Sequence, residues 1–292
     1  MTPQAAAAPF RLSPAKRRGI GLTSVLTYGG LLIGSVFALL PVLWGLSTSL
    51  KPIAEISVYP SRWIPASVTG ANWMAAVFSH RFGEYLVNTV IVVACALLLS
   101  LVLAVHAAHA TVRHEFAGKR LILNLMWATV MIPGVAIIVP LYALAVDLGI
   151  YDTLLVLVVV YSAWLVPTLI WLLRGFVANI PMELEESARV DGCSRLGAFY
   201  RIVLPLLRPG LAAGSMLVFI HIWNEFLIGY SLVLSDEHRL LQVGVYFFVT
   251  ENGIAWGPLM AAAMGSILPV ILIYAFLQRA FIQGLTSGAV KG

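Results

Sequence analysis

The most distinctive polar pattern of this sequence lies between residues 180 and 209. Glu183, Glu185 and Glu186 follow an Ile-Pro pair, and Gly192 comes shortly after them. Carboxylates in the first turn of a helix are stabilised by the positive end of the helix dipole. Glycine suits the left-handed conformation that ends many helices. The pattern therefore predicts a short helix that begins near Glu183 and ends at Gly192.

Capping residues flank this helix on both sides. Pro181 suits a first helical turn, where an N–H is dispensable, and Asn179 just before it is a candidate cap. Beyond the glycine, Ser194 can cap a second helix, after which Leu204 and Pro205 lead toward the next apolar stretch. We expect a helix, a glycine turn and a second helix in succession.

Leu184, Ala188 and Val190 give the predicted helix a small apolar patch between charged flanks. A short rigid helix of this kind fits a groove on a partner protein, where a few apolar anchors are ringed by charges. It could equally lie flat on the inner leaflet of a membrane as an amphipathic helix. The residues alone leave both interpretations open.

No pattern for chemistry on a bound substrate stands out. The sequence lacks the GxxxxGK(S/T) phosphate loop, so we expect this chain not to bind ATP by that route. It shows no nucleophile–base pair, and its His, Cys and carboxylate residues do not cluster at metal-ligand spacing. Cys95 and Cys193 are far apart in the sequence, which disfavours a structural disulfide. We predict neither a catalytic nor a metal site.

The amino-acid composition predicts that most of the protein surface faces lipid. Of the 292 residues 60% are hydrophobic and 11% are charged, whereas soluble domains carry roughly 25% charged residues. So few charges cannot coat a water-facing surface of this size. The net charge of +5 comes from basic residues spread over several loops. This distribution favours positive charge at a membrane face over binding of nucleic acid.

Six apolar stretches are long enough to cross about 30 Å of hydrocarbon as helices. We therefore expect an all-α membrane protein with six transmembrane helices and a helix–turn–helix loop, 176–207, between the fourth and the fifth. The predicted spans are residues 22–47, 85–110, 120–143, 151–173, 208–232 and 258–280. The six spans make one domain, 21–280. Residues 1–20 are expected to be disordered, and residues 281–292 to form a flexible tail.

The placement of lysine and arginine predicts the direction of the spans. With the N-terminus inside, the inner segments hold 14 of the 18 basic residues, and the outer loops hold only Lys51, Arg62, Arg81 and Arg239. Positive charge accumulates on the cytoplasmic side of membrane proteins. We therefore expect both termini and the 176–207 loop to be cytoplasmic. His106 and His109, near the inner end of the second span, are interpreted as interfacial rather than ligating.

Prolines and polar residues within the spans are candidates for a transport path. Pro133 and Pro140 remove backbone hydrogen bonds from the third span, which fits a kinked helix beside a path or a kink that only aids packing. Asn224 and Glu225 fall in the outer half of the fifth span, where an ionisable group marks a pathway or a partner. For this pair, an interhelical hydrogen bond or an interfacial carboxylate is favoured over a sugar ligand. For Asn88, too, a structural role is favoured over a sugar ligand.

The motif in the 176–207 loop resembles the "EAA" loop of bacterial ABC-importer permeases. The spacing from Glu186 to Gly192, and from the glycine to Leu204-Pro205, agrees with the family pattern. Ser187 and Cys193 depart from it, since they stand where the family usually has alanine, but both are small. Nearly the whole chain is similar to the carbohydrate-uptake, maltose-permease-like branch. The further segments that carry this resemblance are Ser49–Pro52, Met131–Tyr142, Trp223–Phe226 and Gly284–Gly292.

This resemblance implies a function and partners. In that family the loop's helix fits a cleft on a homodimeric ATP-binding subunit, which holds ATP and Mg in place of the permease. The other implied partners are a second permease in a heterodimer, an extracytoplasmic sugar-binding protein and the lipid of the bacterial cytoplasmic membrane. The residues assigned to ATPase coupling by the resemblance are Glu183, Glu186, Ser187, Ala188, Asp191, Gly192, Leu204 and Pro205. The translocation-pathway candidates, which come from the span residues themselves and not from the resemblance, are Asn88, Pro133, Asn224 and Glu225.

Other transport functions remain as alternatives. A permease for glycerol phosphate or a phosphodiester would look much the same from this half of a transporter. A secondary transporter would show charged or unwound residues near mid-membrane and an internal repeat, and neither is evident. A membrane-embedded enzyme would need clustered His, Asp or Ser residues at facing depths, which the sequence does not supply. The sequence leaves the transported sugar open.

Overall fold

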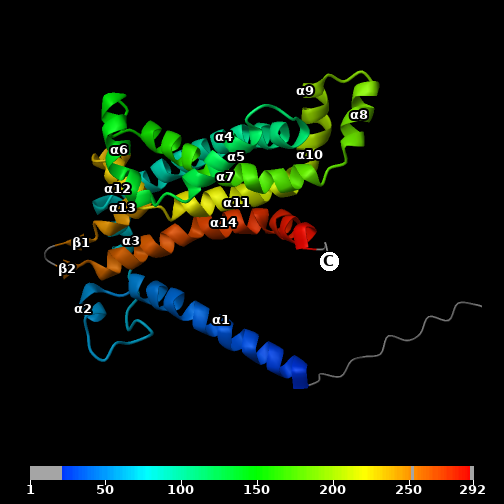
Figure 1. The fold of residues 1–292 in the computed structure, drawn as a ribbon. Coiled ribbons are helices and arrows are strands. Elements are labelled where there is room, and N and C mark those ends of the chain that lie inside the picture. Colours follow the sequence, from blue (N-terminus) through cyan, green and yellow to red (C-terminus); the bar gives the residue numbers. More distant parts are fainter. Residues whose placement is uncertain (1–21, 251–252, 290–292) are drawn as a thin grey trace, which may run out of the picture. The chain divides into compact units, whose positions relative to one another are not determined.

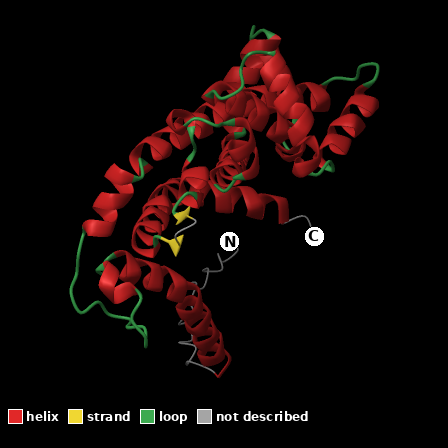
Figure 2. Cartoon of the chain, turned by 90° about the vertical axis from the view of Figure 1, so that its left-hand side faces the viewer, coloured by secondary structure: helices red, strands yellow, loops and turns green. Residues whose placement is uncertain are grey.

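The structure is a computed structural model that describes residues 22–250 and 253–289; the predicted disordered N-terminus, 1–20, lies outside this part. Its regular secondary structure is helical apart from one small antiparallel hairpin, β1 (Val249–Thr250) with β2 (Gly253–Ile254), and loops join the helices, as Figure 2 shows. The helices are α1 (Leu22–Ser49), α2 (Ile53–Ile56), α3 (Ala71–Met74), α4 (Phe82–Arg113), α5 (Lys119–Val130), α6 (Gly134–Asp147), α7 (Leu154–Ala178), α8 (Met182–Val190), α9 (Arg195–Ala198), α10 (Leu204–Leu206), α11 (Arg208–Trp223), α12 (Leu227–Leu232), α13 (Leu241–Tyr246) and α14 (Trp256–Ala289). Two π-helical turns, η1 (Ala75–Ser79) and η2 (Phe199–Val203), and a 3-10 turn, η3 (Asp236–His238), complete the list.

Four of the described helices are long and apolar enough to cross a membrane, and two bent helix pairs raise the number to six if each pair is one span. The expectation of an all-α membrane protein is confirmed. The chain divides into two units, residues 1–44 and 45–292. The described part of the first unit is α1 as far as Trp44. No charged residue interrupts α1, because lipid-facing helices exclude charge.

The centre of the second unit is the packing of α4 against α7. Ala96, Ser100, Ala104 and Ala108 recur every fourth residue of α4, so they lie on one face, and all four are fully buried. Small residues at this spacing let two helix backbones approach closely in a membrane. The Ser162 hydroxyl of α7 reaches the Ala96 carbonyl oxygen at 3.4 Å.

Helices α11 and α14 lie beside this pair, so that the four run side by side in Figure 1. A Cβ on Gly214 of α11 would meet Leu169 of α7 at 3.0 Å, so the glycine permits the close approach of these helices. At one end of the four helices lie α8, α9 and α10, and at the other lie α6, α12 and α13 (Figure 1). We call these the α8 end and the opposite end.

The third predicted span, 120–143, is not one helix. It consists of α5 and α6, which are bent by 102° at a break before Gly134. Pro133 has no N–H to donate and adopts an extended conformation, φ −61° and ψ 132°, and it disfavours helical geometry at the residue before it. The kink predicted at Pro140 does not interrupt the helix, since α6 continues through this residue.

The fifth predicted span, 208–232, is also interrupted. α11 ends at Trp223 and α12 begins at Leu227, with Asn224 to Phe226 between them. The prediction of a continuous helix was wrong because a run of apolar residues has the same hydropathy whether its backbone forms one helix or two. At its other end, α11 meets the Arg195–Leu206 segment at an angle of 71°. The sixth span begins near its predicted position, but α14 continues to Ala289, so residues 281–289 of the expected tail are helical.

Candidate functional site

The candidate site is built around α8, and local sequence chemistry accounts for both of its ends. Pro181 stands at the N-cap with φ −58° and ψ 135°, and Glu183 and Glu185 occupy the first turn, near the positive end of the dipole. The expected cap, Asn179, instead ends α7. The N-cap position falls on Pro181 because α8 begins one residue later than expected, at Met182.

The C-terminal end of α8 closes in a Schellman motif. Gly192 has φ +91°, its N–H donates to the Arg189 carbonyl at 3.1 Å, and the Cys193 N–H donates to the Ala188 carbonyl at 2.9 Å. Only glycine adopts this left-handed conformation without strain. The Ser194 hydroxyl then accepts from the Gly197 N–H at 3.0 Å and caps α9. The predicted helix, glycine turn and second helix are confirmed.

One buried carboxylate joins α8 to the end of α4. Arg113 donates from Nε to Glu185 Oε1 at 2.6 Å, and His109 Nε2 lies 2.9 Å from Glu185 Oε2. The side chains of Glu185 and Arg113 are each 8% exposed. Arg113 also donates from Nη2 to the Ile180 carbonyl at 2.7 Å, which ties α4 to the turn between α7 and α8. We call Glu185, Arg113 and His109 the α8 clamp.

The electrostatics of the clamp keep Glu185 ionised. Burial by itself raises the pKa of this carboxyl, but hydrogen bonds from His109 and Arg113 and the charge of the guanidinium outweigh it. The net effect places the pKa of Glu185 below its ordinary value. A charged carboxylate with two charge-assisted partners is a strong local attachment, because such hydrogen bonds are about twice as strong as neutral ones.

An aromatic cluster holds the return helix against α4. The ring of Phe199 lies 5.0 Å from that of His106 and 4.8 Å from that of His109. His106 Nδ1 is 2.7 Å from the Val102 carbonyl, so it carries the proton and donates, which leaves Nε2 to accept from the Tyr200 hydroxyl at 2.8 Å. Both histidines were interpreted as interfacial, but each one bonds to the loop at the α8 end.

The remaining face of α8 is open. The side chains of Glu183, Glu186, Ser187 and Asp191 are exposed, and the apolar Leu184 and Val190 lie among them, 42% and 87% exposed. Ala188, predicted as part of the exposed patch, is 8% exposed and faces inward with Glu185. It was misplaced because the sequence does not show which side of α8 α4 covers. In the return segment Leu204 is half-buried and Pro205 exposed.

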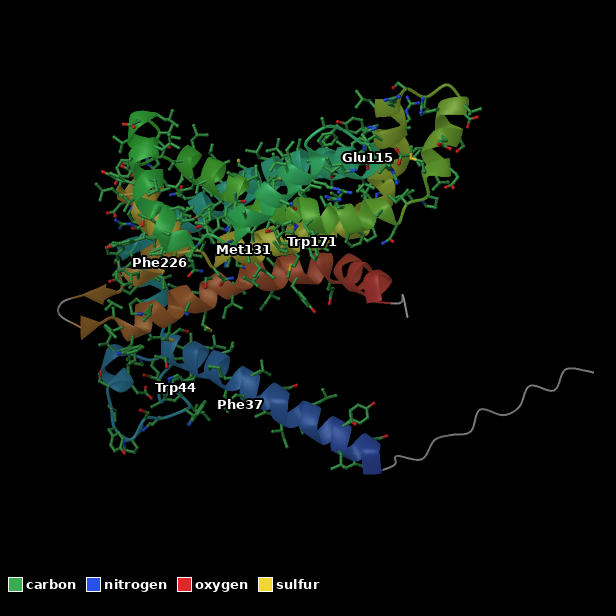
Figure 3. All side chains as sticks on the ribbon, in the orientation of Figure 1. Phe37, Trp44, Glu115, Met131, Trp171 and Phe226 are labelled. Carbon is green, nitrogen blue, oxygen red and sulfur yellow. The ribbon has the colours of Figure 1, made fainter. Side chains whose placement is uncertain are left out.

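The clamp is the part of the site that sequence reasoning missed. Arg113 and Glu185 are 72 residues apart, and no local pattern pairs them. The spacing of Glu185 and Ala188 does indicate a shared position. Because they are three residues apart in a helix, they lie on one face of α8, away from the other acids. In Figure 3 the labelled Glu115, just beyond α4, marks the same end of the molecule, and Phe226 marks the opposite end.

Comparison with known proteins agrees with this geometry. Residues 96–287 match the family described as "binding-protein-dependent transport system inner membrane component". A diacetylchitobiose uptake system permease protein of Streptomyces coelicolor is 38% identical over 90% of this chain and 94% of its own length. A trehalose transport system permease protein of Mycobacterium tuberculosis is 34% identical over 88% and 93%. The chain belongs to this family.

This permease has the same fold as a chain of a solved transporter structure. A chain of a bacterial ABC transporter involved in the import of the acidic polysaccharide alginate superposes with a TM-score of 0.79 over 92% of this chain and 100% of its own, at 22% identity. As a member of the family the permease is a transport subunit of the inner membrane, and ATP hydrolysis belongs to a separate subunit. The prediction of a permease subunit is confirmed.

Two of the predicted pathway residues of the permease, Asn224 and Glu225, lie between α11 and α12. Glu225 caps α12, since its carboxylate accepts from the Ile228 N–H at 2.9 Å and the Gly229 N–H at 3.2 Å. It also accepts from the Tyr161 hydroxyl of α7 at 2.6 Å, so the favoured interpretation, an interhelical hydrogen bond, describes it. The Asn224 amide is exposed and donates to the Ile220 carbonyl at 2.8 Å.

Asn88 and Pro133 have structural surroundings of their own. The Asn88 amide donates to the Glu237 carbonyl at 2.8 Å and the Arg239 carbonyl at 3.1 Å, so it holds the loop after α12. Pro133 is exposed at the break between α5 and α6. Among the described residues no group of three or more His, Cys, Asp or Glu side chains is placed to hold a metal ion.

Proposed function

We propose that this permease is one membrane subunit of an ABC importer for a disaccharide or short oligosaccharide that an extracytoplasmic binding protein delivers. The observation that carries the substrate class is the 38% identity to the diacetylchitobiose permease over 90% of the chain. Relatives named for trehalose and for melibiose, raffinose and stachyose support it at 34% and 33% identity. A solved alginate transporter in complex with an alginate pentasaccharide-bound periplasmic protein shares the fold, with a TM-score of 0.61.

In this function α8 is the attachment point of the ATPase. Leu184 and Val190 supply apolar anchors, and the exposed charges around them are three acids and Arg189, which suits docking in a groove with a mainly basic rim. The acids are Glu183, Glu186 and Asp191, with Ser187 beside them. Gly192 fixes the end of the helix, Ala188 packs beneath it, and Leu204-Pro205 starts the return to the membrane. ATP and Mg are bound by the ATPase.

The orientation in the membrane and the partner subunits follow from the distribution of basic residues and from the family. Because 14 of the 18 basic residues fall on one side, the termini and the 176–207 loop are cytoplasmic in this proposal. The permease pairs with a second permease and with a homodimer of the ATPase. The exposed Asn224 amide is the pathway residue best placed to meet a sugar hydroxyl. Asn88, Pro133 and Glu225 shape the path by holding the backbone around it.

The test has two stages and uses the cognate binding protein. Thermal-shift screening of that protein against diacetylchitobiose, trehalose, raffinose and glycerol 3-phosphate identifies the ligand. ATP-driven uptake of that ligand into proteoliposomes holding the complete transporter then follows. We expect a saccharide to shift the melting temperature and to be transported. A response to glycerol 3-phosphate alone would reject the sugar assignment, and uptake that needs no ATP would reject the importer class.

A further inference from the structure

The helix α4 is held at both of its ends by specific side-chain contacts. It has 32 residues and is therefore about 48 Å long, more than the roughly 30 Å of a bilayer core. At its C-terminal end Arg113 and His109 bind α8 through Glu185. α4 therefore reaches from the proposed ATPase attachment point across the membrane.

At the opposite end, α4 holds the loop between α12 and α13. The Asn88 amide donates to the carbonyls of Glu237 and Arg239 at 2.8 and 3.1 Å. The fully buried Thr89 hydroxyl accepts from the Leu241 N–H at 2.8 Å. Three hydrogen bonds thus bind residues 237–241 to two adjacent residues of α4. A displacement of α4 must carry this loop or break these bonds.

Between its two ends, α4 has no proline that would kink it. Each of the other described helices of 25 residues or more has a proline inside it, at Pro41, Pro167 and Pro269. An interior proline removes a backbone hydrogen bond and kinks a helix. The α11 route from the α8 end is also interrupted, because α11 is bent by 71° against the segment before it and ends at Trp223. α7 is also continuous, through Pro167, and Asp152 just before it accepts from the N–H groups of Leu234 and Ser235. Of the two continuous helices between the α8 end and this loop, α4 is therefore the one without an interior proline.

We propose that α4 is the element that transmits the movement of α8 to the loop of residues 234–241 on the opposite side of the membrane. This inference rests on the proposed function, in which ATPase closure moves α8. The α8 clamp makes α8 and α4 move as one body, and Asn88 and Thr89 pass that movement to the loop. Glu185, Arg113, Asn88 and Thr89 are therefore positioning residues of the transport cycle.

The test follows the loop directly in the complete transporter. Leu234 is 70% exposed, so Leu234→Cys, in a background with Cys95→Ser and Cys193→Ser, can be labelled by a membrane-impermeant maleimide. Labelling rates are compared with ATP and Mg and without nucleotide, in lipid nanodiscs with the ATPase and the loaded binding protein present. We expect the rate to depend on nucleotide in the parent protein.

Two nearly isosteric changes weaken the contacts at the two ends of α4. Glu185→Gln removes the charge at the α8 end, and Asn88→Leu removes both donors at the opposite end. Each should abolish the nucleotide dependence of labelling, and the double variant should be no worse than either one, because both act on one route. Glu185→Asp keeps the charge and should restore part of the response. Glu115→Gln is the matched control, since its carboxylate lies at the same end but is 90% exposed.

The outcomes separate this inference from the proposed function. Full nucleotide dependence in Asn88→Leu, together with its loss in Glu185→Gln, would overturn α4 as the route. Losses that multiply in the double variant would also overturn it, because they indicate two separate routes. Thr89→Val replaces Asn88→Leu if the latter lowers the yield of assembled transporter. If the parent protein neither responds to nucleotide nor takes up sugar, the proposed function itself fails.

Discussion

Replacing Glu185 by alanine should release α8 from α4. The change leaves Arg113, whose side chain is 8% exposed, as a buried charge without its carboxylate. Removing one partner of a buried ion pair costs about 3–5 kcal/mol, most of it the penalty of the charge that stays behind. This cost falls on the docked state alone, because water reaches Arg113 once α8 lifts away. Since each 1.4 kcal/mol is a factor of ten, α8 should open roughly 100-fold to 4,000-fold more often.

Hydrogen exchange measures this opening. The amides of Met182–Val190 are followed in the permease in nanodiscs, and Glu185→Ala should exchange faster by that factor. The matched control is Glu186→Ala, which removes an exposed carboxylate from the neighbouring position of the same helix. Surface substitutions usually change stability by less than about 0.5 kcal/mol, so exchange in the control should stay near that of the parent. Equal protection in the two variants would refute the assignment of the clamp.

Three further predictions concern single positions. The pKa of Glu185 lies below its ordinary value of 4.5, so its stabilisation is complete above that value and is lost as pH falls through the lower, folded-state pKa. Thermal unfolding of the parent and Glu185→Gln should therefore converge as the pH is lowered below 4.5. Gly244→Ala should lower the melting temperature, because a Cβ there would overlap the Tyr85 ring, whereas Gly175→Ala in α7 has open space and should not. Ser194→Ala removes the cap of α9 and should cost about 0.5–2 kcal/mol of unfolding free energy.

Features set by neighbouring residues were predictable from the sequence. Gly192 and Ser194 act within their own turn, so their roles follow from backbone geometry and from one side-chain acceptor. Long apolar runs likewise indicate spans, because nothing but lipid or a buried core can surround them. Ala188 shows the limit, since its spacing indicates a face of α8 but not what covers that face.

The features that escaped prediction depend on distant parts of the chain. The clamp joins residues 72 positions apart, and Glu225 meets Tyr161 across 64. The break after Trp223 contains neither proline nor glycine, and the α12 amides that Glu225 accepts from are ordinary members of an apolar run. Only the folded chain shows that this carboxylate caps a helix.

In the proposed function α8 connects this permease to a separate ATPase that drives import. ATP-driven uptake into proteoliposomes by the complete transporter, compared between the parent and Gly192→Val, tests it most directly. Gly192 has φ +91°, which valine adopts only with strain, so the substitution should disrupt the end of α8 and leave the membrane spans intact. We expect the variant to insert normally and to lose uptake. Uptake at the parent's rate would show that α8 is not the connection to the ATPase.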